Sequence, residues 1–285
     1  MLEVRFHGRG GQGAVTSAEI VAEAAIDLGK YAQSMPSFGP ERRGAPVLAY
    51  LRVSDMPIRI RAEIKKPNIV VVLDDGLLTG VDVTAGLAKD GLLIINTRQD
   101  EDAIRQAIGY SGKLALVDAL SIAMECLGVP ITNTTMIGAL IKVSGIIPIE
   151  AALKQVGHRF NAKLAEKNVN ALKKASEVAK VFAPKEVKSA PKKAASAGQT
   201  WKEITVGALI DNPGDARSYN TGDWRSQKPE WDQSKCIKCG VCYMFCPEGA
   251  IKMNAEGYPE VDLFYCKGCG ICAKECWTKC FKMVR

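Results

Sequence analysis

The chain has 285 residues, of which 47% are hydrophobic and 24% charged, enough for one sizeable domain and a smaller one. Its net charge is +7, but residues 173–193 alone hold seven lysines and two glutamates, a local charge of +5. We therefore expect a solvated basic segment there. Because aromatic residues make up only 6% of the chain and the rest of it is close to neutral, we exclude nucleic-acid binding. No run of about eighteen apolar residues occurs, which excludes a membrane-spanning protein.

Residues 1–183 are predicted to form an α/β sandwich domain with a mostly parallel sheet. The chain starts directly on a strand-like alternation without the apolar core of a signal peptide, so we expect a cytoplasmic protein. Residues 69–73 and 92–95 are apolar throughout, as in parallel strands covered on both faces. A long amphipathic helix is expected over about 160–182. The other expected elements are strands at 2–6, 47–51, 68–74, 91–96 and 113–118 and helices at 13–29 and 119–128.

A glycine-rich turn lies between the first strand and the first helix. Gly8, Gly10 and Gly13 fit G-x-G-x-x-G, and the helix that follows offers free N–H groups to an anion. A nicotinamide cofactor would need an acid after the second strand, which should end near 34–35, but the first acid is Glu41. Anion or pyrophosphate binding and a purely structural turn therefore stay equally open. The candidate cofactor-binding residues are Arg9, Gly10, Gly11, Gln12 and Gly13.

Several other segments and residues of this domain are candidate site or contact residues. The loop at 37–44 has a charged centre between turn-forming residues, and its composition leaves a contact loop and a solvated turn almost equally open. His7 and His158 have no nucleophile beside them and are expected to be structural. Cys126 lies in an apolar helical pattern and is expected to be a core residue. We therefore predict no catalytic residue in this chain.

Residues 184–234 differ from the first domain in composition and lack its hydrophobic periodicity. Residues 184–200 are rich in Lys, Ala, Ser and Pro and are predicted to be a flexible linker. Residues 201–234 contain three tryptophans and little periodicity, so we expect an extended docking arm that lies against a partner or against the first domain. Such a tether suggests two units that exist elsewhere as separate chains.

Residues 235–285 carry two matched cysteine runs, each C-x2-C-x2-C-x3-C, that begin thirty residues apart (266 − 236). In a reducing compartment these cysteines are better metal ligands than disulfides. We predict a small α+β bacterial-type ferredoxin domain with two 4Fe-4S clusters, in which the fourth cysteine of each run crosses to the other cluster. The expected ligands are Cys236, Cys239, Cys242 and Cys276 for cluster one, and Cys266, Cys269, Cys272 and Cys246 for cluster two.

Structural zinc is the main alternative for the cysteine runs. Zinc sites usually combine two C-x2-C pairs set apart by a loop, which fits four cysteines within eleven residues poorly. The second run departs from the first at two positions: Trp277 stands where the first has Pro247, and Cys280 stands where it has Ala250. Because the counterpart of Cys280 is small and apolar, we expect Cys280 to be a packing residue and not a ligand.

These features together resemble the 2-oxoacid:ferredoxin oxidoreductase family. The segments GRGGQGAVTSAEIVAEAA and SFGPERRG are similar to the start of its gamma subunit, although Ala45 replaces the last glycine of the pattern S-x-G-P-E-x-R-G-G. The segment TGDWR at 221–225 and the cysteine runs look like its delta subunit. The resemblance covers almost the whole chain except the linker and implies a gamma–delta fusion.

The resemblance implies a subunit of an enzyme that oxidatively decarboxylates a 2-oxoacid, by default pyruvate. Thiamine diphosphate and a further cluster would lie in alpha and beta partner subunits. This chain would pass electrons to an external ferredoxin, and its glycine-rich turn would contact coenzyme A phosphates. Residues 267–285 hold five basic residues and one acid, which predicts steering of an acidic ferredoxin. The alternatives are a self-contained NAD(P)H- or flavin-linked reductase with a ferredoxin tail and a zinc scaffold.

Overall fold

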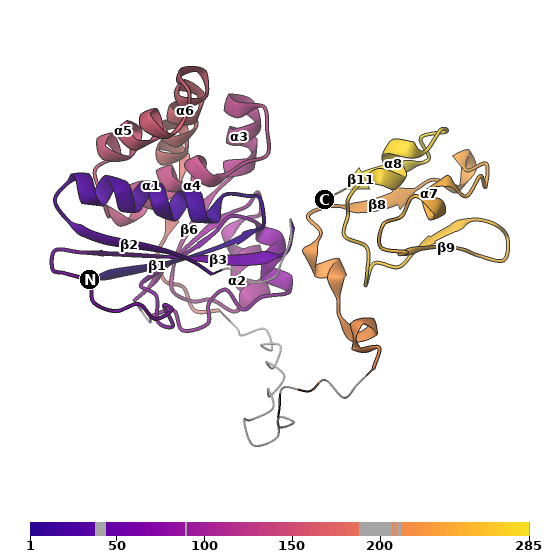
Figure 1. Cartoon of the computed structure of the whole chain (residues 1–285), viewed down its shortest axis with the longest axis horizontal. Coiled ribbons are helices and arrows are strands. Elements are labelled where there is room, and N and C mark those ends of the chain that lie inside the picture. The colour runs from indigo at the N-terminus through magenta and orange to yellow at the C-terminus, as the bar shows by residue number, and fades with distance from the viewer. Residues whose placement is uncertain (38–43, 89, 188–206, 208, 210–212, 285) are drawn as a thin grey trace. The chain divides into compact units, whose positions relative to one another are not determined.

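A computed structural model describes residues 1–37, 44–88, 90–187, 207, 209 and 213–284 of the chain (Figure 1). They belong to two compact units, residues 1–190 and 191–285. Most of the loop at 37–44, residues 188–200 of the expected linker and Trp201 lie outside the described residues. Within the described part, no helix has the length and apolar character that crossing a membrane requires.

The N-terminal unit is built on a seven-stranded sheet in the order β2-β3-β1-β4-β5-β6-β7. Strands β1, β4, β5 and β6 pair in parallel, and β2 runs in the same direction because both it and β1 are antiparallel to β3. Five of the seven strands therefore point one way, which confirms the predicted mostly parallel sheet. The strands are β1 Leu2–Arg9, β2 Tyr31–Ser37, β3 Pro46–Ser54, β4 Ile69–Val72, β5 Leu92–Asn96, β6 Lys113–Val117 and β7 Lys180–Phe182.

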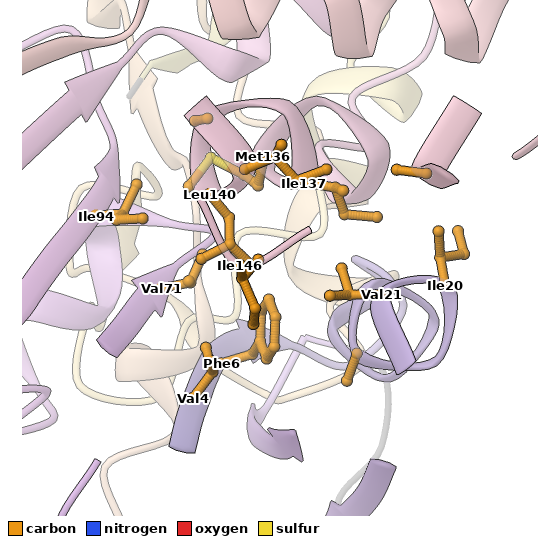
Figure 2. Packing of buried hydrophobic residues seen from close by; sticks show 14 of the residues in the cluster. Val4, Phe6, Ile20, Val21, Val71, Ile94, Met136, Ile137, Leu140 and Ile146 are labelled. Atoms are coloured by element: carbon orange, nitrogen blue, oxygen red, sulfur yellow. The ribbon is translucent and has the colours of Figure 1, made fainter. Parts of the chain in front are cut away.

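Helices cover both faces of this sheet. On β4, Ile69 and Val71 face the larger apolar cluster, whereas Val70 and Val72 face the smaller one, as the alternation of a strand requires. Helices α1 and α3 to α6 pack on the larger cluster, and Figure 2 shows Val71 there among side chains of β1, α1 and α4. The helices are α1 Ala14–Asp27, α2 Glu101–Ile108, α3 Ala119–Leu127, α4 Asn133–Ser144, α5 Ile149–Arg159 and α6 Ala162–Val178, with the 3-10 turn η1 Asp75–Thr79.

The single helix expected over 160–182 is wrong at both ends. Helix α6 begins after Asn161, whose side chain accepts a hydrogen bond from the backbone N–H of Leu164 and so caps the helix. The chain leaves the helix at Ala179 and forms β7, which pairs antiparallel with β6 at the sheet edge. Val181 and Phe182 continue the apolar pattern of the helix, so periodicity alone could not separate the short strand from it.

The C-terminal unit is a duplicated strand–loop–helix–strand motif. Strand β8 pairs antiparallel with β11, and β9 pairs antiparallel with β10, so each small sheet takes one strand from each repeat. Pro229 pairs with Met283, and their counterparts in the other repeat, Pro259 (thirty residues later) and Met253 (thirty residues earlier), also pair with each other. The elements are η2 Asp215–Ser218, η3 Thr221–Trp224, β8 Lys228–Trp231, η4 Gln233–Lys235, α7 Val241–Met244, β9 Ile251–Met253, β10 Pro259–Val261, α8 Ile271–Glu275 and β11 Phe281–Val284.

The repeat extends to backbone conformations that favour glycine. Lys238 has a φ of 55°, and its counterpart thirty residues on is Gly268 with a φ of 66°. Lys279 has a φ of 52°, and its counterpart is Gly249 with a φ of 59°. Left-handed backbone is uncommon for lysine, so the loop geometry around the cysteines is kept even where the side chain does not favour it.

Residues 221–231 of the expected docking arm make contacts inside the cysteine-bearing C-terminal unit. The Thr221 hydroxyl donates to the carbonyl of Tyr265 at 2.9 Å, and the Lys267 ammonium lies 4.6 Å from the ring centre of Trp224. Trp231 is in β8 and stacks on Tyr258 at 5.8 Å. Trp224 and Trp231 therefore pack on side chains of the cysteine-bearing unit.

Candidate functional site

The eight cysteines of the two runs surround two cavities in the C-terminal unit. Each cavity takes three cysteines from one run and the fourth from the other run, which are the two groups that the sequence predicts. The first cavity is lined by Cys236, Cys239, Cys242 and Cys276. The second is lined by Cys266, Cys269, Cys272 and Cys246. Cys280 also lines the first cavity.

The local fold explains how three cysteines of a run come to face one cavity. Gly240 and Gly270 precede the short helices α7 and α8 with φ of 72° and 82°, a conformation open to glycine, so the chain can turn sharply after the second cysteine. The third cysteines, Cys242 and Cys272, lie in these helices and are buried. The second cysteine of each run is exposed.

The fourth cysteines receive matched backbone hydrogen bonds. The N–H of Ala250 donates to Cys246 Sγ at 3.3 Å, and the N–H of Cys280 donates to Cys276 Sγ at 3.3 Å. Cys276 has two more partners, Cys280 Sγ at 3.4 Å and Thr278 Oγ1 at 3.6 Å. The two fourth cysteines therefore share one matched backbone hydrogen bond and differ in side-chain hydrogen bonding.

These contacts govern the pKa values of the free thiols. Burial tends to raise the pKa of Cys276, but hydrogen bonds from Thr278, Cys280 and backbone N–H groups outweigh it and lower that pKa to about 7. Burial, together with the hydrogen bond to Cys276, raises the pKa of Cys280 to about 12. Cys280 is 5% exposed and belongs to the apolar cluster of this unit with Ile251 and Phe281, so it packs as expected. Its hydrogen bond was not foreseen from the sequence.

The donor set and its spread fit iron–sulfur clusters. A tetrahedral zinc site needs its ligands to meet at one ion, with Zn–S distances of about 2.3 Å. Within the described residues, no three Cys, His, Asp or Glu side chains are grouped in that way. The four thiols around each cavity instead enclose a space, and four cysteine thiolates are the usual ligands of a 4Fe-4S cluster.

The side chains of the glycine-rich turn are engaged inside the N-terminal unit. Arg9 is 3% exposed, and its Nε lies 3.4 Å from Asp74 Oδ2. Gln12 Nε2 donates to the same carboxylate oxygen at 2.6 Å, and Gln12 Oε1 accepts the backbone N–H of Arg9 at 2.8 Å. These bonds connect the turn to the residues that follow β4.

The backbone of the turn is equally constrained. Gly10 donates to the carbonyl of Ala45, and Gly44 donates to the carbonyl of Gly10, so the turn is held to the start of β3. Gly13 has a φ of 82°, and a Cβ there would lie 2.7 Å from Nδ2 of Asn133. Close packing therefore accounts for this glycine. Gly11 also has a positive φ, 94°.

The sheet order is unlike a dinucleotide-binding unit. That unit places its second strand beside the first and parallel to it. Here β3 lies between β1 and β2 and is antiparallel to both. The absence of an acid after the second strand, noted in the sequence, agrees with this difference.

A buried Arg–His pair lies at another point on β1. The Nε–H of Arg5 donates to Nε2 of His7 at 3.0 Å, and both residues line a cavity with Asp82. Burial and the positive charge of Arg5 lower the pKa of His7 to about 3, so His7 is neutral at physiological pH. His158 lies in the last turn of α5, and Cys126 is half-buried against the larger apolar cluster.

Comparisons with known proteins assign both units. Residues 3–178 match the family model described as pyruvate ferredoxin/flavodoxin oxidoreductase, and residues 230–283 match that of a 4Fe-4S dicluster domain. The chain is 51% identical over 183 residues to the pyruvate/ketoisovalerate oxidoreductases common subunit gamma of Pyrococcus abyssi, which covers 64% of this chain and 99% of that protein. It is 50% identical over 179 residues to pyruvate synthase subunit PorC of Methanocaldococcus jannaschii, covering 63% and 95%.

Solved structures agree on the fold. Pyruvate oxidoreductase subunit PORC of Thermotoga maritima matches with a TM-score of 0.58 and 38% identity, covering 63% of this chain and 97% of that one. The 2-oxoglutarate:ferredoxin oxidoreductase of Magnetococcus marinus matches with a TM-score of 0.51 at 15% identity, covering 66% and 33%, which shows the fold alone. The family seen in the sequence motifs is confirmed: the chain belongs to the pyruvate ferredoxin/flavodoxin oxidoreductase family, as a gamma-type subunit of a 2-oxoacid:ferredoxin oxidoreductase that continues into a 4Fe-4S dicluster domain.

Proposed function

We propose that this chain is the fused gamma and delta subunit of a thiamine-diphosphate-dependent 2-oxoacid:ferredoxin oxidoreductase. In this proposal it carries electrons from catalytic alpha and beta subunits, through two 4Fe-4S clusters, to an external ferredoxin. The observation that carries the proposal is the pair of cysteine-lined cavities in a chain whose first unit is gamma-type. Pyruvate is the default substrate, because the similar proteins are named for pyruvate or ketoisovalerate.

We assign the ligands of the two clusters by cavity. Cluster one takes the four cysteines of the first cavity, and cluster two takes the four cysteines of the second. Bound there, each cluster would supply a one-electron carrier. The chain's own part is to hold four thiolates around each cavity and to set their hydrogen bonds. The assigned ligands are Cys236, Cys239, Cys242 and Cys276 for cluster one, and Cys266, Cys269, Cys272 and Cys246 for cluster two.

Metal and sulfide analysis of the anaerobically purified chain tests this assignment. We expect about eight irons and eight acid-labile sulfides per chain, because each 4Fe-4S cluster contains four of each. Structural zinc would give two zinc ions and no sulfide, and that result would end the electron-carrier proposal. Cys126→Ala is the matched control, because Cys126 lies in the other unit and should leave the iron content unchanged.

The chemistry on the 2-oxoacid is assigned to partner chains. The sequence offers cluster ligands but no predicted catalytic residue, and the proteins similar to the first unit are named as subunits. Thiamine diphosphate and a further cluster are accordingly proposed in alpha and beta partner subunits. Coenzyme A is a candidate ligand of the turn at residues 9–13, although the internal contacts of Arg9 and Gly13 support a structural turn.

The external ferredoxin is proposed to dock on the C-terminal unit near exposed lysines of its second repeat. Lys274 and Lys282 are exposed there, and Trp277 is 81% exposed beside the ligand Cys276. We expect Lys274→Glu with Lys282→Glu to lower kcat/KM for an acidic ferredoxin about tenfold at low salt, because steering acts mainly on association. The measurement is ferredoxin reduction by the assembled enzyme at low and high ionic strength.

High salt should remove most of this difference between wild type and variant, because it screens exposed charges. The KM for the 2-oxoacid should not change. Lys163→Glu is the control, since Lys163 is an exposed lysine of the N-terminal unit. Ferredoxin reduction that is independent of salt in the wild type would argue against electrostatic steering.

A further inference from the structure

The two repeats of the C-terminal unit provide an internal comparison of the fourth cysteine ligands. Cys246 and Cys276 each accept a matched backbone N–H, from Ala250 and Cys280, at 3.3 Å. Cys276 is also 3.4 Å from the Sγ of Cys280, whereas the counterpart of Cys280 is Ala250, which has no side-chain donor. The hydroxyl of Thr278 lies 3.6 Å from the same sulfur.

The counterpart of Thr278 is an acid that is engaged elsewhere. Glu248 pairs with Lys267 at 3.0 Å and cannot donate a hydrogen bond when ionised. Side-chain donors therefore reach the sulfur of Cys276 and have no equivalent at Cys246 among these positions. The backbone bonds from Ala250 and Cys280 have the same length, so these side-chain donors distinguish the two fourth cysteines.

The direction of the sulfur–sulfur hydrogen bond follows from coordination. A thiol that binds a metal is deprotonated, so Cys276 can only accept once it ligates a cluster. Cys280 is outside the assigned ligand set, is 5% exposed and packs in the apolar cluster with Ile251 and Phe281. Its S–H is therefore the available donor. Its packing holds this sulfur beside Cys276 already when the cluster is oxidised.

We propose that Cys280 donates a hydrogen bond to the thiolate of Cys276 and thereby raises the reduction potential of cluster one. The inference rests on the proposed function, because it requires two clusters with the assigned ligands. Reduction adds one negative charge that is shared with the ligand sulfurs, so a donor aimed at such a sulfur stabilises the reduced state more than the oxidised state. Hydrogen bonds to sulfur are among the factors that set the potentials of iron–sulfur clusters. Cys280 is thus a tuning residue for one cluster of the pair.

The test is a redox titration of the full chain with both clusters present, followed by electron paramagnetic resonance. Cys280→Ala installs the residue of the other repeat. We expect one of the two midpoint potentials to fall, with a threefold to tenfold lower ratio of reduced to oxidised cluster at a fixed potential, or about 30–60 mV at 59 mV per tenfold. The other potential should stay unchanged. Cys280→Ser keeps a donor and should preserve the wild-type potential, whereas Thr278→Val should lower the same potential as Cys280→Ala.

Iron content separates the possible failures. The wild-type chain must first show about eight irons, since a lower number contradicts the proposed function itself. If Cys280→Ala keeps eight irons and both potentials are unchanged, or both move together, Cys280 does not tune cluster one. If Cys280→Ala loses about four irons, Cys280 is a ligand, and the inference is wrong in a different way.

Discussion

Replacing Cys246 by alanine is expected to remove about four of the eight irons, and the lost cluster should be the one bound by the other cysteine run. Cys246 belongs to the first run but lines the cavity of Cys266, Cys269 and Cys272. Without a fourth thiolate, that cavity offers three cysteine ligands, one fewer than a 4Fe-4S cluster normally takes. The first cavity keeps all four of its cysteines and should retain its cluster.

Double variants distinguish this crossed arrangement from a local one. Cys246→Ala with Cys266→Ala should retain about four irons, like the single variant, because both changes damage the same cluster. Cys246→Ala with Cys236→Ala should lose nearly all iron, because one ligand is removed from each cluster. Iron and sulfide per chain are the readout, and Cys126→Ala supplies the unaffected control. The opposite pattern for the two pairs would show that each run binds its own cluster.

The cysteine groups could be predicted because spacing alone constrains them. Two matched runs thirty residues apart imply a duplicated motif, and the crossing of the fourth cysteine follows from how such runs wrap clusters. The structure adds that the motif begins before Cys236. Strand β8 is the counterpart of β10, and a signal was present in the sequence, since Pro229-Glu230 recurs as Pro259-Glu260. A four-residue strand is too short for periodicity to reveal it.

The sequence-based predictions fail at positions where contacts between distant segments determine the local structure. The residues after α6 keep a helical apolar pattern but pair with β6, because the edge of the sheet offers hydrogen bonds that the pattern does not record. The alignment of Cys280 with Ala250 in the repeat predicts a packing residue only. Its contact with Cys276 depends on the turn that brings residues 276 and 280 together, and no substitution pattern in a single sequence shows such a contact.

Arg9→Ala is expected to destabilise the N-terminal unit without changing the use of coenzyme A. Arg9 is buried against Asp74, which also accepts from Gln12, so the variant leaves a carboxylate with one fewer partner. Removing one member of a buried ion pair typically costs about 3 kcal/mol, or roughly 6–12 °C in Tm for a unit of this size. Far-UV circular dichroism of the full chain reports this change, because the long helices lie in that unit.

The same variant decides between the two roles of the glycine-rich turn. In the assembled enzyme, a structural turn predicts an unchanged KM for coenzyme A at a temperature well below the lowered Tm. A raised KM with an unchanged Tm would instead assign Arg9 to the phosphates. Arg61→Ala removes an exposed arginine of the same unit and should alter neither quantity. Asp74→Asn, combined with Arg9→Ala, should cost less than the sum of the two single changes if the buried pair carries the effect. Additive costs would place the stabilising role of Arg9 in its other contacts.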